Sequence, residues 1–174
     1  MKLIVCLLLI TMAMAEALQA LEKLPSDLVV RPESEEYDEI LQSYYSGLNR
    51  ELKPAVFFTP RSASQAAEII KAVKSCARPS TIAICGAGQQ TTPGVANVQG
   101  GLTFHLRNLT GVELDVEKNI VSVAAGEQMG KVYEVLEAAG LTVVGGRHSY
   151  NGIGGLAVQG ELPYCIPLQD EKFD

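Results

Sequence analysis

The chain has 174 residues and a net charge of −6, which is enough length for one domain with a sizeable core but leaves little room for a second. Its hydrophobic content of 47% and charged content of 20% are typical of globular proteins, so a wholly disordered chain is excluded. The negative charge and the absence of any Lys/Arg cluster longer than two residues provide no basic surface for a polyanion. We therefore expect no nucleic-acid partner.

The N-terminus has the pattern of a cleaved secretory signal. Lys2 precedes an apolar run over residues 3–12, and the small-x-small triplet Ala13-Met14-Ala15 follows. The run is too short to span the ~30 Å hydrocarbon core of a bilayer, and no stop-transfer pattern follows it. We therefore expect residues 1–15 to be removed and the mature protein to be secreted, with no membrane partner.

Residues 16–53 are expected to form a helical lead-in. A short helix is expected over 16–23 and an extended segment over 27–32. Apolar residues at spacings of three and four predict an amphipathic helix over 33–45, ended by Gly47. The carboxylates at its start indicate a solvated helix face.

A strand, a helix and a second strand follow in order. Residues 55–58 form a compact apolar run of strand-forming side chains. Ser62 and Gln65 form a capping box at the start of a helix that reaches Val73. Residues 81–85 form the second apolar strand and lead directly into a glycine-rich loop. This order predicts one βαβ unit.

The middle of the chain changes character. Short extended pieces at 103–106, 111–115 and 120–124 are separated by turn residues, which predicts a small antiparallel meander. Helical spacing returns over 127–139, and a strand is expected at 141–144 before a second glycine-rich loop. The predicted fold class is α+β, with βα units around the meander.

The first glycine-rich loop reads Gly86-Ala87-Gly88-Gln89-Gln90-Thr91-Thr92. A diphosphate needs several converging backbone N–H groups, and glycine lets the chain turn tightly around such a ligand. A dinucleotide fingerprint of the Rossmann type is disfavoured, because the third glycine is missing and Pro93-Gly94 replaces the start of a helix. No Gly-Lys-Ser/Thr is present, which excludes a Walker loop. These residues leave open both a plain turn and a ligand-binding loop.

The second glycine-rich loop, at 145–155, repeats the pattern after another βα unit, so the two loops could clamp one extended ligand. His105 and His148 have no Cys or acidic residue at a metal-ligand spacing, and we expect no metal site. No Gly-x-Ser-x-Gly elbow supports hydrolysis. Cys76 and Cys85 could either meet in a disulfide or remain as free thiols.

Four stretches in this order carry a family resemblance. Residues 54–62, 84–88, 109–115 and 140–156 resemble the vanillyl-alcohol-oxidase type (PCMH-type) FAD-binding domain, and especially the berberine-bridge-enzyme-like FAD-linked oxidases. The resemblance implies the N-terminal part of such a domain, in which the first loop holds the FAD pyrophosphate through backbone amides. The second loop would line the same cofactor.

The resemblance also names the residues expected to bind FAD. They are Gly86, Ala87, Gly88, Gln89 and Gln90 in the first loop, and Gly145, Gly146, His148, Gly152, Gly154 and Gly155 in the second. Many relatives tether the flavin through a histidine in the first loop, and some add a cysteine in the second. The corresponding positions here hold Gln89 and His148, so we expect FAD to be bound non-covalently.

The family pattern is lost after Gly160. We therefore expect an FAD-binding domain at 54–160 and a divergent tail at 161–174, with no substrate domain. Full-length relatives act on a small-molecule substrate, but no catalytic residue can be assigned here and the chain alone is expected to be inactive.

The functional hypothesis is an FAD-binding oxidoreductase of the secreted, berberine-bridge-like kind. The alternatives are a non-catalytic flavin-binding fragment and a secreted binding protein without enzymatic activity.

Overall fold

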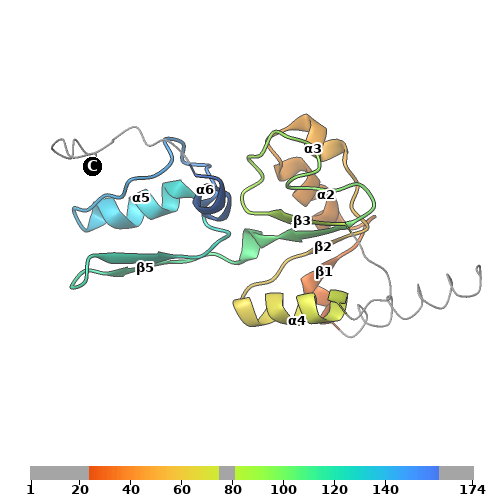
Figure 1. The fold of residues 1–174 in the computed structure, drawn as a ribbon, viewed down its shortest axis with the longest axis horizontal. Helices are drawn as coiled ribbons and strands as arrows, with labels where there is room; N and C mark the ends of the chain where they lie inside the picture. The colour runs from red at the N-terminus through yellow and green to blue at the C-terminus, as the bar shows by residue number, and fades with distance from the viewer. Residues whose placement is uncertain (1–23, 75–80, 161–174) are drawn as a thin grey trace, which may run out of the picture.

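The computed structural model describes residues 24–74 and 81–160. The predicted signal peptide, the short helix at 16–23, Cys76 and the tail at 161–174 lie outside these ranges. In Figure 1 the described elements form two groups, one around a four-stranded sheet and one around a hairpin.

The larger group is built on a four-stranded sheet with the order β1-β2-β4-β3. Its strands are β1 (Val29–Val30), β2 (Val56–Phe58), β3 (Ile82–Cys85) and β4 (Leu102–His105). β1 runs antiparallel to β2, whereas β2, β4 and β3 are mutually parallel. The predicted βαβ unit is present, but β4 lies between its two strands.

The position of β4 corrects the predicted meander. Residues 103–106 were expected in an antiparallel meander, yet every residue of β4 is buried between two parallel neighbours. A strand covered on both faces needs no alternation of polar and apolar residues, so the sequence pattern did not reveal its sheet. Of the three pieces of the predicted meander, only the last two pair with each other, as the antiparallel strands β5 (Val112–Asp115) and β6 (Ile120–Val123).

Helices cover both faces of the sheet (Figure 1). α2 (Glu35–Ser43) and α3 (Gly47–Glu51) lie on one face, and α4 (Ala63–Lys74) lies on the other. Phe57 packs toward α2, whereas Val56 and Phe58 pack toward α4. The alternation of side chains along β2 therefore divides the interior into two apolar clusters, one under each helical layer.

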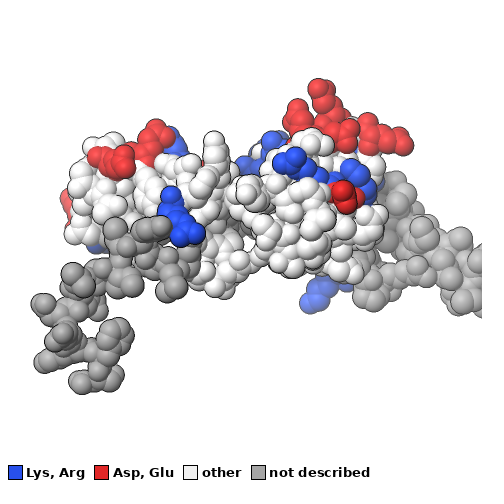
Figure 2. Space-filling model, turned by 90° about the horizontal axis from the view of Figure 1, so that it is seen from above, with Lys and Arg blue, Asp and Glu red and all other residues white. Residues whose placement is uncertain are grey.

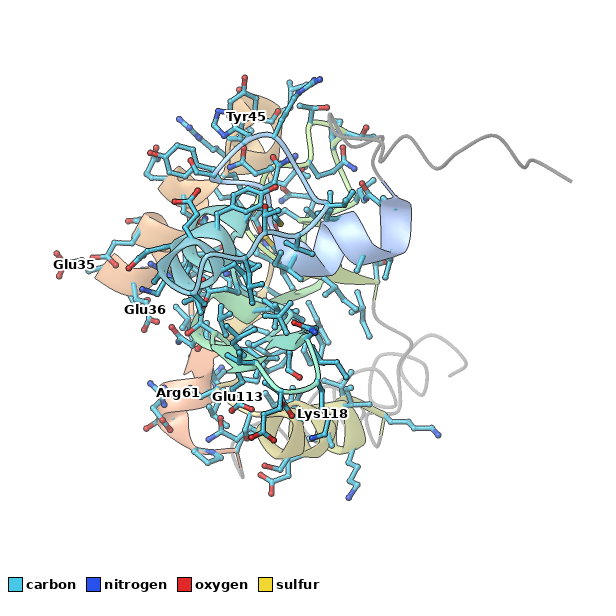
Figure 3. The ribbon with its side chains drawn as sticks, turned by 90° about the vertical axis from the view of Figure 1, so that its left-hand side faces the viewer. Glu35, Glu36, Tyr45, Arg61, Glu113 and Lys118 are labelled. Carbon is cyan, nitrogen blue, oxygen red and sulfur yellow. The ribbon has the colours of Figure 1, made fainter. Side chains whose placement is uncertain are left out.

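α2 and α4 each begin with a serine cap, of which the sequence predicts the one at Ser62. The Ser34 hydroxyl accepts from the Tyr37 amide at the start of α2 (3.2 Å), and the Ser62 hydroxyl accepts from the Gln65 amide at the start of α4 (3.2 Å). The first turn of α2 is acidic, which suits the positive end of the helix dipole. Acidic side chains gather over this region in Figure 2, and Glu35 and Glu36 point outward in Figure 3.

The smaller group packs α5 (Met129–Ala138) against the β5–β6 hairpin. Met129, Val132 and Leu136 form the buried face of α5. Two 3-10 turns, at Ser26–Leu28 and Leu106–Asn108, complete the connections. None of the described helices is long and apolar enough to cross a bilayer.

Two predictions near the C-terminal part were wrong. Residues 141–144 form no strand, and Val144 is 52% exposed. Four residues with strand-forming side chains cannot by themselves supply a pairing neighbour. The second glycine-rich loop also ends earlier than predicted, since its last glycines belong to α6 (Ile153–Gln159).

Candidate functional site

The first glycine-rich loop is held through its carbonyl groups by residues 45–49, here called the α2–α3 segment, which follow α2 and include the first residues of α3. The Tyr45 amide donates to the Gly88 carbonyl (3.0 Å), and the Asn49 side-chain amide donates to the Gln90 carbonyl (2.7 Å). The Ser46 hydroxyl donates to the Thr91 carbonyl at the longer distance of 3.4 Å. The α2–α3 segment therefore sets the orientation of three peptide groups in the loop.

The amides of this loop are left available for a ligand. In a planar trans peptide the N–H points opposite to the C=O, so fixing the Gly88 and Gln90 carbonyls turns the amides of Gln89 and Thr91 the other way. Within the described part of the chain, neither amide donates a hydrogen bond to a protein acceptor. Several converging free amides are what an anion requires.

Gly88 is required for the shape of the loop. Its φ of 71° lies in the left-handed region, and a Cβ placed there would lie 3.4 Å from Cα and the ring of Tyr44. The same Cβ would also lie 3.7 Å from the Cys85 sulfur, so the loop packs closely against the end of β3 at this point. Gly88 therefore shapes the loop, and its neighbours supply the free donors.

The second glycine-rich segment is fastened to the chain that precedes and begins α5. The amides of Gly154 and Ile153 donate to the carbonyls of Ala125 (3.1 Å) and Glu127 (2.9 Å). In the other direction, the amides of Met129 and Gly130 donate to the backbone carbonyls of Asn151 (2.9 Å) and Ser149 (2.9 Å). These four bonds fix the segment as firmly as the α2–α3 segment fixes the first loop.

The two loops touch at Gly152 and Ala87. A Cβ placed on Gly152 would lie 2.8 Å from both the backbone nitrogen and the Cβ of Ala87, a distance that no side chain could occupy without displacing the first loop. Gly86 also lies near Gly155, but a Cβ on Gly86 would be in ordinary contact, 3.8 Å from the Gly155 nitrogen. Glycine at these positions allows two backbones to approach closely.

A cavity of about 310 Å³ lies where the loops meet. Its volume is at the lower end of the range for small-molecule sites. Of the residues predicted to bind FAD, it brings together Gly86, Ala87, Gly88, Gln89, Gln90, Gly152 and Gly155. The lining also contains Thr91 of the first loop, and the structure adds Asn151, Leu156 and Gln159, which the sequence had not singled out.

A second cavity of about 460 Å³ adjoins the first and shares Gln89 and Asn151 with it. Its other lining residues are Tyr45, Arg147, His148 and Tyr150. The rings of His148 and Tyr150 lie 5.4 Å apart at an angle of 37°. The two positions expected to have lost a flavin tether, Gln89 and His148, therefore share one cavity although they are far apart in sequence.

Three of the predicted site glycines line neither cavity. Hypothetical Cβ atoms on Gly145 and Gly154 would lie 2.5 Å from the Met129 methyl and 2.6 Å from the Ala125 carbonyl oxygen. Gly146 is buried, and its carbonyl accepts from the Tyr133 hydroxyl (2.7 Å). Close packing accounts for Gly145 and Gly154, and a role for these glycines in binding FAD stays a prediction.

Two titratable groups lie buried beneath the first loop. Burial raises the pKa of the free Cys85 thiol to about 11. Burial, with a smaller contribution from Arg107, lowers the pKa of His105 to about 4. Neither group lines the two cavities, and within residues 24–74 and 81–160 no three His, Cys, Asp or Glu side chains gather as a metal site would require.

The residues present fit a diphosphate. The first loop offers amides without protein acceptors, and the glycines of the second segment leave room that a Cβ would fill. Sequence reasoning found both loops but missed the α2–α3 segment, because a single Asn in a short helix carries no recognisable pattern.

Comparisons with known proteins agree with this geometry. The FAD binding domain family model matches residues 54–170. The FAD-dependent monooxygenases FUP4 of Fusarium proliferatum and tpcD of Cochliobolus heterostrophus are each 32% identical over 131 residues, which cover 75% of this chain and 25% of the relative.

Solved structures share the fold at lower identity. 6-Hydroxy-D-nicotine oxidase from Arthrobacter nicotinovorans has a TM-score of 0.63 at 21% identity, covering 74% of this chain and 27% of that one. Wild-type Phl p 4.0202, a glucose dehydrogenase, has a TM-score of 0.62 at 20% identity, covering 78% and 29%. The chain thus spans about a quarter of the length of its curated relatives. Since the family model covers more than half of the chain, the protein belongs to the FAD binding domain family.

Proposed function

We propose that the chain binds FAD non-covalently in the cavity between its two glycine-rich loops and forms the FAD-binding part of a secreted oxidoreductase. The observation that carries this proposal is the meeting of the loops at Ala87 and Gly152, beside the free amides of Gln89 and Thr91. When bound, FAD supplies a ring that accepts hydride from a substrate. The residues of this chain bind and orient it.

The whole protein's activity is part of the proposal, because the chain spans only about a quarter of its relatives. Those relatives are named FAD-dependent monooxygenases, and the structural neighbours include oxidases and dehydrogenases. The relatives depend on FAD, and the two structural neighbours oxidise a small molecule, 6-hydroxy-D-nicotine or glucose. We infer that class of reaction, with catalytic groups supplied from outside the described residues.

A non-covalent link is favoured by the side chains at the two tether positions. Gln89 presents a primary amide, which is a poor nucleophile, and His148 is exposed with its Nδ1 near the Tyr150 amide (3.4 Å). Burial and hydrogen bonding would then retain the cofactor, so its affinity would depend on the loop amides.

The binding test uses the purified full chain and FAD. Titration calorimetry should show saturable binding at one site, and acid precipitation should leave the flavin in the supernatant. Absence of binding to the well-folded protein would overturn FAD binding and favour a secreted binding protein without a flavin. A yellow pellet would overturn the non-covalent link, and the His148→Ala variant would then identify the attachment point.

Secretion is tested separately. Expression of the full chain in a secreting host should release a protein whose N-terminus, read by mass spectrometry, is Glu16. The motivation is the charged start, the apolar run and the Ala13-Met14-Ala15 triplet. Retention inside the cell with Met1 intact would contradict it.

A further inference from the structure

We propose that Asn49 is a positioning residue for the diphosphate. Its side-chain amide holds the Gln90 carbonyl away from the cavity and thereby turns the Thr91 amide toward the ligand. This inference rests on the proposed binding of FAD, and it adds a determinant of affinity that lies outside both glycine-rich loops.

Asn49 is fixed from both its side chain and its backbone. It is completely buried, and its Nδ2 donates to the Gln90 carbonyl at 2.7 Å, the shortest of the three bonds between the α2–α3 segment and the loop. Because a carbonyl can only accept, the amide nitrogen must face it. The Asn49 carbonyl accepts in turn from Asn97 Nδ2 (2.9 Å).

The direction of the Gln90 carbonyl decides what the cavity presents to an anion. Gln90 and Thr91 both line the cavity, and they are joined by one peptide group. If the carbonyl pointed inward, its partial negative charge would repel a diphosphate. Held outward by Asn49, it leaves the N–H of the same peptide on the opposite side. One hydrogen bond therefore decides whether this peptide group presents its N–H or its C=O to the cavity.

A buried polar chain ties Asn49 to the centre of the sheet. Asn97 Nδ2 also donates to the Leu52 carbonyl (2.9 Å), and Asn97 Oδ1 accepts from the Thr103 hydroxyl of β4 (3.1 Å). Asn49 Oδ1 is buried and has no partner among the described residues, so this side chain is hydrogen-bonded to them only through its donor Nδ2. This series of buried hydrogen bonds holds the first glycine-rich loop in position relative to β4.

A second peptide group of the loop, between Gly88 and Gln89, uses the same arrangement. The Tyr45 amide donates to the Gly88 carbonyl (3.0 Å), which turns the Gln89 amide the other way. The side chain of Tyr45 is 67% exposed and lies at the surface in Figure 3. A change at this position therefore offers a second test that does not disturb the buried chain.

The test compares Asn49→Ala with Thr103→Val in the full-length protein. Both variants remove one hydrogen bond from the same buried chain, but only the first one removes the bond to the loop. We expect both to lower the melting temperature. Asn49→Ala should raise the dissociation constant of FAD about tenfold, the effect of one lost hydrogen bond to a charged group, while Thr103→Val should stay within twofold.

A spectroscopic signal separates positioning from general weakening. The ³¹P resonances of bound FAD report the donors around the diphosphate, so they should shift in Asn49→Ala and not in Thr103→Val. Unchanged affinity and unchanged ³¹P shifts in Asn49→Ala would overturn the proposal. Absence of FAD binding to the wild-type protein would overturn the proposed function, and this inference with it.

If Asn49→Ala does not fold, a comparison of Tyr45→Pro with Tyr45→Ala tests the positioning of the loop carbonyls instead. Both lack the tyrosine ring, but only proline also lacks the N–H that holds the Gly88 carbonyl. Tyr44 has extended backbone angles (φ −67°, ψ 136°), which suit a residue before proline. Weaker FAD binding in Tyr45→Pro than in Tyr45→Ala supports carbonyl positioning by this segment, whereas equal binding overturns it.

Discussion

The imidazole of His105 meets the ring of Tyr44 edge-on, with the ring centroids 5.8 Å apart at an angle of 89°. Phe57 contacts the same imidazole from β2, with centroids 6.2 Å apart. Both ring nitrogens of His105 are buried and have no hydrogen-bond partner among the described residues. His105 is therefore held neutral in an apolar environment, directly across from Cys85 at the base of the first loop.

His105 should make the protein less stable in acid. Its folded-state pKa of about 4 lies below the unfolded value of 6.5, so the unfolded chain binds the proton first as the pH falls. Stability is full above about pH 6.5 and is lost progressively down to about pH 4, by about 3 kcal/mol in total. Urea unfolding between pH 7 and pH 4.5 measures this loss.

The control for this prediction is His105→Phe. Phenylalanine fills a similar space and cannot titrate, so the difference in pH dependence between the two proteins isolates His105 from the carboxylates. Parallel stability curves for both proteins would contradict the prediction.

Gly152→Ala should separate the two loops. The new Cβ would lie 2.8 Å from the Ala87 backbone, which cannot move without shifting the first loop. We expect a stability loss of about 1–3 kcal/mol, as for other overpacked sites, and at least tenfold weaker FAD binding. Calorimetric titration with FAD checks the affinity. Gly47→Ala, where nothing lies within 4 Å of the new Cβ, should leave the affinity unchanged.

Gly126→Ala should destabilise the junction between the two groups of elements. Its Cβ would lie 1.8 Å from the Leu106 carbonyl oxygen and 2.7 Å from that of Leu109, and both atoms belong to the backbone. The Gly126 amide also donates to the Leu109 carbonyl (2.9 Å), a bond that any shift would strain. We expect a loss of about 3 kcal/mol or more in chemical denaturation.

Gly155→Ala is the matched control, because a Cβ on this helical glycine meets nothing within 4 Å. It should be neutral or slightly stabilising in the same denaturation experiment. Equal melting of the two variants would show that the junction tolerates the extra carbon.

Cys85 should be inert to alkylation in the folded protein. Burial raises its pKa from 9.0 to about 11, so at pH 8 the reactive thiolate is about 100-fold less populated than for an ordinary thiol. Treatment with iodoacetamide, followed by peptide mass mapping, should leave Cys85 unmodified in buffer and modify it in urea. Rapid labelling in buffer would show that the base of the first loop opens.

Much of the fold was predictable where the signal is local. The capping box at Ser62 and Gln65, the helix that ends before Gly140 and the strand that leads into Gly86 all depend on neighbours within a few residues. The predictions failed where pairing decided the outcome. The pieces at 103–106 and 141–144 were both predicted as short extended segments, but only the first finds two parallel neighbours.

The candidate site likewise contains some features that the sequence predicts and others that it does not. Both glycine-rich loops could be found from the sequence because glycine is needed wherever a backbone turns tightly or approaches another closely. The proposed role of Asn49 could not be found from the sequence, because its bond to Gln90 joins residues 41 positions apart. A contact at that separation depends on how α3 lies against the sheet.

The sequence by itself determined the strand, helix and strand of the βαβ unit, the helix that ends before Gly140, the two glycine-rich loops and the likeness to FAD-linked oxidases. These follow from side-chain periodicity and backbone freedom, which act over a few residues. Only the tertiary structure decided that β4 divides the predicted βαβ unit, that Ala87 meets Gly152, and that the loop carbonyls turn outward. Those outcomes depend on contacts between distant segments, whose geometry becomes fixed only when the two apolar clusters close around the sheet.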